Sequence, residues 1–174
     1  MTNQDLFTIK PLNQWIEEAA SRTDPRSLFG DFWLKGELSI LFSDAGKGKS
    51  LLAAQIAESI ASGIPVEPLA MSAQPQKVLY FDLELSSQQF AMRYAADPGP
   101  GDEFLKNPYR FSKNFCRAEL AASGTLPEEY KTYEAEYVLA SIEKAIRASG
   151  AKVVIIDSIA WVQGSNAAAA ILYP

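Results

Sequence analysis

The chain has 174 residues, which is enough for about one domain with a buried core. Its net charge of -5 argues against a general electrostatic attraction to nucleic acid, and its single cysteine excludes a disulfide framework. The chain contains no histidine, which excludes histidine-ligated zinc and histidine general bases, and no apolar run is long enough to span a membrane.

The first predicted element is a short helix over 12–20, where apolar residues recur at helical spacing. We expect it to be a packing helix in an N-terminal segment, 1–27, that precedes the main domain, 28–174. Within that domain, the apolar run over 38–42 predicts a strand that leads into a glycine-containing loop.

A helix is predicted directly after this loop, with a buried face that carries Leu52, Ile56 and Ile60. Gly63 is its natural end, because glycine readily adopts the left-handed conformation that closes many helices. A second strand is predicted over 77–83, after a proline-rich connection.

The following helix is expected to begin at Ser86 or Ser87, with serine as its N-cap, and to run through Arg93. A loop is predicted over 97–102, and the alternating pattern over 109–115 predicts an edge strand.

The last two predicted elements are a helix over 134–148, closed by Gly150, and a strand over 152–157. This strand is almost wholly apolar, as is typical of a central parallel strand. Strands that alternate with helices predict an α/β fold with a mostly parallel central sheet and helices on both faces.

Residues 43–50 read Ser-Asp-Ala-Gly-Lys-Gly-Lys-Ser, a phosphate-binding loop in which serine replaces the first glycine. Its place between a strand and a helix favours a nucleotide site over a glycine-rich turn with two solvated lysines. Successive backbone N–H groups can surround an anion, and two glycines allow its close approach. The expected nucleotide contacts are Ser43, Asp44, Ala45, Gly46, Lys47, Gly48, Lys49, Ser50 and Leu51.

Two side chains of this loop are expected to act directly on ATP and Mg²⁺. Lys49 would reach the terminal phosphates, where phosphoryl transfer needs charge neutralisation, and the Ser50 hydroxyl would bind the metal. The side chain of Lys47 is expected to face solvent instead.

Acidic residues follow two predicted strands, at the sheet edge where α/β proteins gather their sites. Asp157 closes its strand like a Walker B aspartate and is predicted to hold a Mg²⁺-bound water, the alternative being a cap on the next turn. Glu84 is the candidate for orienting the attacking water. Asp82 lies on the same strand face and competes for that role, and either carboxylate could instead cap the helix that follows.

Four blocks carry a family resemblance when they are taken together, namely 36–41, 45–50, 80–93 and 153–160. The most specific is Glu-Leu-Ser-x-x-Gln, which begins at Glu84. In this order the blocks resemble the RecA-like P-loop ATPases, especially the branch of hexameric replicative helicases and plasmid RepA helicases.

The resemblance implies that Glu84 and Lys49 are catalytic and that Asp157 is the Mg²⁺-associated acid. It places Arg93 near the nucleotide base, although a solvated helix arginine explains that residue equally well. Ser158 matches a serine that helps to hold the water shell of the metal.

Members of this family continue past the Walker B strand with sensor residues, DNA-binding loops and an arginine finger. This chain reaches only Pro174, so we expect the C-terminal part of the domain to be missing. Single-stranded DNA would then bind through residues beyond Pro174, and a longer form would assemble as a homo-oligomer, a hexamer.

The sequence therefore predicts Mg²⁺-dependent ATP hydrolysis in DNA replication, plasmid or transposon mobilisation, or recombination. The alternatives are a P-loop small-molecule kinase and a regulatory protein that binds ATP without appreciable hydrolysis. Against the kinase, no arginine-rich lid is evident over 97–132, where Arg110, Lys113 and Arg117 form the nearest cluster. The first residues lack the basic start and apolar core of a signal peptide, so we expect a cytoplasmic protein.

Overall fold

A computed structural model describes residues 8–21, 26–94, 109–120 and 134–158. The predicted loop over 97–102 and the chain after Ser158 lie outside these described residues. At the N-terminal end, α1 (Leu12–Ala20) forms as predicted and is followed by a short antiparallel hairpin of β1 (Ser27–Phe29) and β2 (Trp33–Leu34). None of the residues of α1 is buried, so its packing role stays a prediction.

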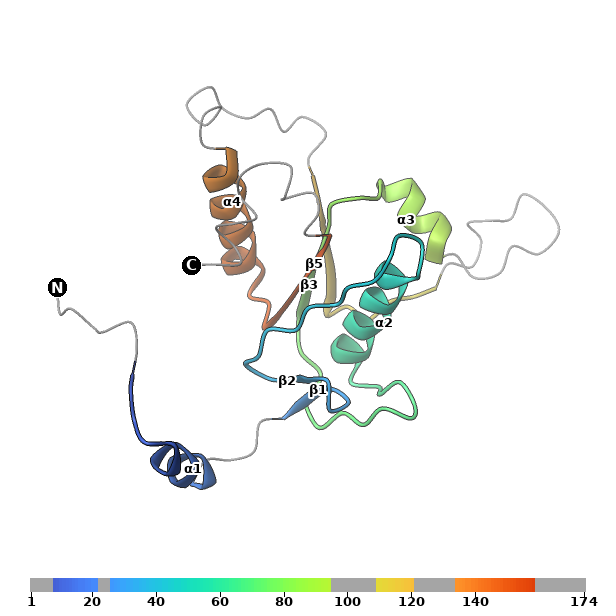
Figure 1. Ribbon diagram of the computed structural model, residues 1–174. Helices are drawn as coiled ribbons and strands as arrows, with labels where there is room; N and C mark the ends of the chain where they lie inside the picture. The colour runs from blue at the N-terminus through green and yellow to red at the C-terminus, as the bar shows by residue number, and fades with distance from the viewer. Residues whose placement is uncertain (1–7, 22–25, 95–108, 121–133, 159–174) are drawn as a thin grey trace.

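The larger sheet of the described chain is parallel, with the strand order β4-β3-β5. Its strands are β3 (Val78–Asp82), β4 (Phe115–Glu119) and β5 (Val153–Asp157). Figure 1 shows α2 (Lys49–Ser62) and α4 (Glu134–Ser149) on opposite sides of this sheet. This arrangement confirms the predicted α/β class with helices on both faces.

The middle strand of the described sheet is β3, with β5 beside it, so the central position predicted for the strand over 152–157 stays a prediction. All five residues of β3 are buried, and Val78 pairs with Phe115 on one side and with Val153 on the other. The middle residues of β5 are only half-buried. An apolar run predicts burial but does not identify the neighbours of a strand.

Helix α2 packs on the sheet through small side chains. Ala54, Ala57 and Ala61 are buried together with Ile60, whereas Leu52, predicted to lie on the buried face, is 37% exposed. Alanines allow the helix backbone to approach the strands closely, so the buried face is turned away from Leu52. The helix ends at Gly63 as predicted, with a φ of 77° and a hydrogen bond from its N–H to the carbonyl of Ser59.

The strand predicted over 38–42 is not formed. Leu38 and Phe42 are each 85% exposed, and no backbone hydrogen bond joins this segment to a strand among the described residues. An apolar run becomes a strand only where a neighbouring strand accepts and donates its hydrogen bonds, and none of the described strands does so here.

The predicted edge strand over 109–115 is also wrong, because the strand begins where the prediction ends, at Phe115. The aromatic residues of the predicted segment instead form a cluster. Phe111 contacts the rings of Phe90, Tyr94, Tyr109 and Phe115, with ring centroids 4.8–6.0 Å apart. The alternation therefore reflects aromatic packing and not strand pairing.

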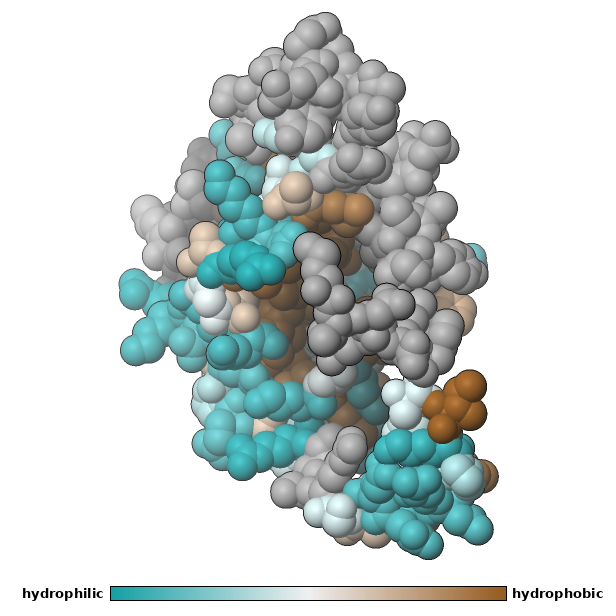
Figure 2. All heavy atoms as spheres, turned by 90° about the vertical axis from the view of Figure 1, so that its left-hand side faces the viewer, coloured by the Kyte–Doolittle hydropathy of each residue, from teal (hydrophilic) through white to brown (hydrophobic). Residues whose placement is uncertain are grey.

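The two remaining helices follow the sequence closely. In front of α3 (Ser87–Tyr94), Gln89 N–H donates to Ser86 Oγ, and Ser86 N–H donates to Gln89 Oε1. This reciprocal pair is a capping box and confirms the predicted serine N-cap. Figure 2 shows hydrophobic side chains along the middle of the face of the molecule that it presents.

Candidate nucleotide-binding site

The phosphate loop, 43–50, runs directly into the N-terminus of α2. Gly46 and Gly48 have φ values of 73° and 86°, and a Cβ atom added at either would meet nothing within 4 Å. Glycine is thus favoured by the backbone conformation and not by crowding. Leu52 N–H makes a helical hydrogen bond to the carbonyl of Gly48, which leaves the N–H groups before it available to an anion.

The ammonium group of Lys49 lies across the beginning of the loop. Its Nζ donates to the carbonyls of Ser43 at 2.7 Å and Asp44 at 2.9 Å. Lys49 and Ser50 are half-buried, whereas Lys47 is exposed, as predicted. The loop therefore brings a cation and a hydroxyl to the first turn of α2, where partial positive charge from the helix also favours phosphate.

Asp157 lies on the side of the sheet that carries this loop. Alternate residues of a strand share a face, and Val153 and Ile155 pack with α2 residues in the core, which places Asp157 on that face. Figure 1 shows the N-terminus of α2 and the carboxyl ends of β3 and β5 at the same end of the molecule. The structure thus gathers the loop and both predicted acids at one edge of the sheet.

The carboxylate of Asp157 is held by a buried tyrosine of the neighbouring strand. Tyr80, only 1% exposed, donates its hydroxyl to Asp157 Oδ2 at 2.5 Å. Burial, together with this hydrogen bond and the carboxylate charge, raises the pKa of Tyr80 far above its usual value. The tyrosine is therefore protonated and fixes one carboxylate oxygen, while Oδ1 has no protein partner among the described residues.

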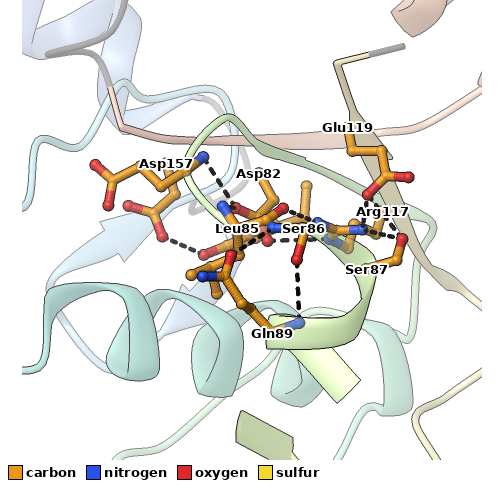
Figure 3. A network of polar contacts seen from close by, with 10 residues as sticks. Asp82, Leu85, Ser86, Ser87, Gln89, Arg117, Glu119 and Asp157 are labelled. Atoms are coloured by element: carbon orange, nitrogen blue, oxygen red, sulfur yellow. Dashed lines mark hydrogen bonds and ion pairs between the residues drawn. The ribbon is translucent and has the colours of Figure 1, made fainter. Parts of the chain in front are cut away.

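The two carboxylates that compete for the role of general base differ sharply in their surroundings. Asp82 is 3% exposed, and its Oδ1 accepts the backbone N–H groups of Glu84 and Leu85. Its Oδ2 is paired with Arg117 Nε at 3.0 Å. Figure 3 shows Asp82 inside this network, between Leu85 and Arg117.

Glu84, by contrast, is exposed, and its Oε1 accepts a hydrogen bond from Ser158 Oγ at 2.6 Å. This bond joins the end of β3 to the residue that follows Asp157. Glu84 therefore presents a carboxylate close to the Walker B position, whereas Asp82 caps the turn that carries it, as the sequence allowed.

Arg93 lies in the last turn of α3 and is exposed. It does not line the apolar pocket of about 470 Å³ that runs along α2, whereas its neighbour Tyr94 does. Leu51, the last of the predicted nucleotide contacts, lies at the phosphate-loop end of this pocket and is 56% exposed. The pocket thus begins next to the phosphate loop and is also lined by three aromatic side chains, Tyr94, Tyr109 and Phe111.

Sequence reasoning missed two residues that organise the site, Tyr80 and Arg117. Both reach diagonally across the sheet to an acid on a neighbouring strand, Tyr80 to Asp157 and Arg117 to Asp82. Neither contact has a signature in the linear sequence, because it depends on the register in which Tyr80 lies opposite both Arg117 and Ile155. A tyrosine and an aspartate in an otherwise apolar, buried strand were the available hint.

The donor set fits Mg²⁺ held together with a nucleotide. No group of three or more acidic, cysteine or histidine side chains that could hold a metal occurs among the described residues. Mg²⁺ is usually bound through one or two protein oxygens, waters and substrate phosphates, and Ser50 and Asp157 could supply that protein share.

Comparison with known proteins agrees with this geometry. Residues 7–170 match the family model described as the AAA domain, and this match spans nearly the whole chain. No match was found among curated proteins or among solved structures. The chain belongs to the AAA domain family of P-loop NTPases, a RecA-like family whose members bind and hydrolyse nucleoside triphosphates. Within the described part of the chain, no helix is long and apolar enough to cross a membrane.

Proposed function

We propose that this chain is a Mg²⁺-dependent ATPase in which Glu84 activates the attacking water. The observation that carries the proposal is the contrast between the two carboxylates of the β3 edge. Asp82 is buried and engaged by Arg117, whereas Glu84 is exposed and contacts Ser158 beside the Walker B strand. Of these two carboxylates, the exposed Glu84 is therefore the one that we propose approaches the attacking water in front of a bound triphosphate.

The other site residues supply binding and charge neutralisation. Lys49 pairs with the terminal phosphates, whose oxygens would replace the loop carbonyls that its ammonium contacts. Backbone N–H groups of the loop hold the phosphate chain. Ser50 would bind Mg²⁺ directly and Asp157 would hold a Mg²⁺-bound water, and the metal would supply charge compensation on the phosphate oxygens.

The proposed reaction is attack of water on the terminal phosphorus. The water oxygen forms a bond to phosphorus, the bond to the bridging oxygen breaks, and ADP leaves with the electron pair. Glu84 accepts the proton that the water gives up. Arg93 and the adjacent pocket are proposed to receive the nucleotide base, since Leu51 and Tyr94 line that pocket.

The biological role that we propose is that of the helicase-related RecA-like branch, in DNA replication, plasmid or transposon mobilisation, or recombination. The Glu-Leu-Ser-x-x-Gln block at Glu84 supports this branch. Such proteins work as rings or filaments on single-stranded DNA, and an arginine from a neighbouring molecule raises turnover about 10³- to 10⁵-fold. We therefore expect slow hydrolysis by the isolated chain and faster hydrolysis when it assembles as a hexamer on single-stranded DNA.

Steady-state ATP turnover measured with and without Mg²⁺ and single-stranded DNA tests this function. Slow, Mg²⁺-dependent phosphate release that rises with protein concentration or with DNA is the expected result. ATP binding without phosphate release under any condition would instead identify a regulatory protein. Transfer of the phosphate to a small-molecule acceptor would identify a kinase.

A further inference from the structure

The turn that carries Glu84 is built by a buried carboxylate. Asp82 Oδ1 accepts the N–H of Glu84 at 3.2 Å and that of Leu85 at 2.9 Å. A side-chain oxygen that accepts N–H groups two and three residues ahead fixes the direction in which the chain leaves its strand. The position of Glu84 relative to the sheet therefore depends on the position of the Asp82 carboxylate.

That carboxylate is in turn held by Arg117 from the neighbouring strand β4. Arg117 Nε donates to Asp82 Oδ2 at 3.0 Å, and Nη2 donates to the carbonyl of Leu85 at 2.5 Å. One guanidinium thus contacts the residue two positions before Glu84 and the residue directly after it. Figure 3 shows Arg117 with Asp82 and Leu85 together on one side of it and Ser87 and Glu119 on the other.

The same guanidinium also fixes the start of α3. Arg117 Nη1 donates to Ser87 Oγ at 3.2 Å and to Glu119 Oε2 at 2.6 Å, and the guanidinium carbon lies 4.8 Å from the ring centre of Phe90. The planar guanidinium of arginine has five N–H donors and can reach all of these groups at once. The ammonium of a lysine is a compact charge at the end of its side chain and cannot.

Arg117 leaves the Glu84 carboxylate itself untouched. Its hydrogen bonds to described residues go to Asp82, Leu85, Ser87 and Glu119, while Glu84 Oε1 is bonded to Ser158. An arginine that paired with Glu84 would neutralise the charge that a general base needs. Here the arginine acts on the backbone around the glutamate and not on its charge.

We propose that Arg117 is a positioning residue for ATP hydrolysis, which acts through Asp82 to hold the turn that presents Glu84. The inference rests on the proposed function, because it assigns Arg117 to the same chemical step. A displacement of about 1 Å in a reacting group can lower a rate roughly 10²-fold. Arg117→Gln should therefore lower kcat by about 10²-fold and leave the affinity for ATP unchanged.

The test measures kcat for ATP hydrolysis under steady-state conditions, and ATP affinity by titration, in Arg117→Gln, Arg117→Lys, Glu84→Gln and the double variant. Arg117→Lys should not restore the rate, because an ammonium cannot span Asp82 and Leu85. In the Glu84→Gln background, Arg117→Gln should add no further loss, since its effect operates through Glu84. Arg147→Gln is the matched control, because the side chain of Arg147 is 78% exposed and, among the described residues, pairs with Glu143 of the same helix α4 alone.

The outcomes separate this inference from the function on which it rests. A wild-type kcat in Arg117→Gln, or rate losses that multiply in the double variant, would overturn the positioning role. Normal turnover by Glu84→Gln would overturn the proposed function itself. Should Arg117→Gln melt below the assay temperature, Asp82→Asn keeps the arginine and tests the same contact, with a smaller loss of kcat and no loss of ATP affinity expected.

Discussion

In the phosphate loop the polar groups are exposed or half-buried, and backbone conformation arranges them. At the carboxyl edge of the sheet, by contrast, Asp82 and Asp157 are buried and held by other side chains. Gly46 and Gly48 shape the loop by their positive φ values, and the residues from Ser43 to Gly48 are exposed. At the sheet edge, Asp82 and Asp157 are at most 9% exposed and are bonded to side chains of neighbouring strands.

This difference determines what a substitution should do. In the loop, the loss of a side chain removes a ligand contact with little effect on folding, because the side chain contributes little to the core. At the sheet edge, the loss of one partner leaves a buried polar group unsatisfied and lowers stability. Glu84 belongs to neither group, because it is exposed but stands on a turn that buried residues hold.

The largest expected effect is on the loop side. Lys49→Ala removes the ammonium that would face the triphosphate, and charge-assisted contacts of this kind stabilise binding by about 1.5–3 kcal/mol, or roughly 10²-fold at the upper end. We expect ATP affinity to fall by about that factor while the melting temperature stays unchanged. Calorimetric titration measures the affinity, and Lys47→Ala, an exposed loop lysine, is the control. Equal losses in both variants would remove the distinction between the two lysines.

A second test concerns Asp157 and its proposed role in Mg²⁺ binding. Asp157→Asn keeps an oxygen for the Tyr80 hydroxyl but loses the negative charge that would attract Mg²⁺. Loss of such an indirect metal partner commonly lowers metal affinity about 10- to 100-fold. The Mg²⁺ concentration that gives half-maximal turnover should rise by that factor, and the exposed Asp31→Asn should leave it unchanged. An unaltered Mg²⁺ requirement in Asp157→Asn would show that Asp157 has no part in the metal site.

A third test measures how much the buried hydroxyl of Tyr80 contributes to the free energy of unfolding. Tyr80→Phe leaves a buried carboxylate oxygen of Asp157 without its donor, which should lower the free energy of unfolding by about 1–3 kcal/mol. Tyr109→Phe is the control, since Tyr109 is 54% exposed and its hydroxyl lies 3.5 Å from Glu58. Urea denaturation of both variants gives the comparison, and equal stabilities would contradict the role assigned to Tyr80.

The same hydrogen bond predicts a pH dependence. The pKa of Tyr80 is raised in the folded protein, so its stabilisation is complete below the unfolded value of 10.0 and is lost as pH rises above it. The difference in unfolding free energy between wild type and Tyr80→Phe should accordingly be constant near neutral pH and shrink in strong alkali. A gap that widens there would mean that the tyrosine ionises more easily when folded.

The smallest expected effect is on the melting temperature and comes from Glu119, an exposed residue at the carboxyl end of β4. Hydrogen bonds from Ser87 and Arg117 lower the pKa of Glu119 in the folded protein. The stabilisation by its ionised form is therefore present above the unfolded value of 4.5 and is lost as pH falls through the folded pKa. Wild type and Glu119→Gln should differ slightly in melting temperature at neutral pH and converge in acid, and a gap that grows in acid would contradict this account.

The sequence identified those features that depend on local pattern. The helices at 12–20 and 134–148, the Gly63 stop, the Ser86 cap and the β3 and β5 strands all have local signals, and the structure has each of them. The phosphate loop was found in the same way. These features were predictable because each depends on the pattern of a short stretch of consecutive residues.

What the sequence could not provide was pairing between distant strands. The run over 38–42 has strand composition without a strand partner, and the strand after Tyr109 begins only at Phe115, where the chain comes alongside β3. The roles of Tyr80 and Arg117 depend on the same pairing register. The choice between Asp82 and Glu84 also required the pairing of the strands. Both carboxylates lie at the carboxyl end of β3, and what separates them is burial and contact partners: Arg117 on β4 for Asp82 and Ser158 after β5 for Glu84.

The most direct measurement is therefore ATP binding and turnover in Glu84→Gln beside Asp82→Asn. We predict that Glu84→Gln retains ATP and Mg²⁺ binding but loses turnover by about 10²- to 10⁴-fold, as expected for removal of a general base. Asp82→Asn should lose less, because Glu84 remains in place. Normal turnover by Glu84→Gln together with an inactive Asp82→Asn would contradict the account and assign the catalytic carboxylate to Asp82.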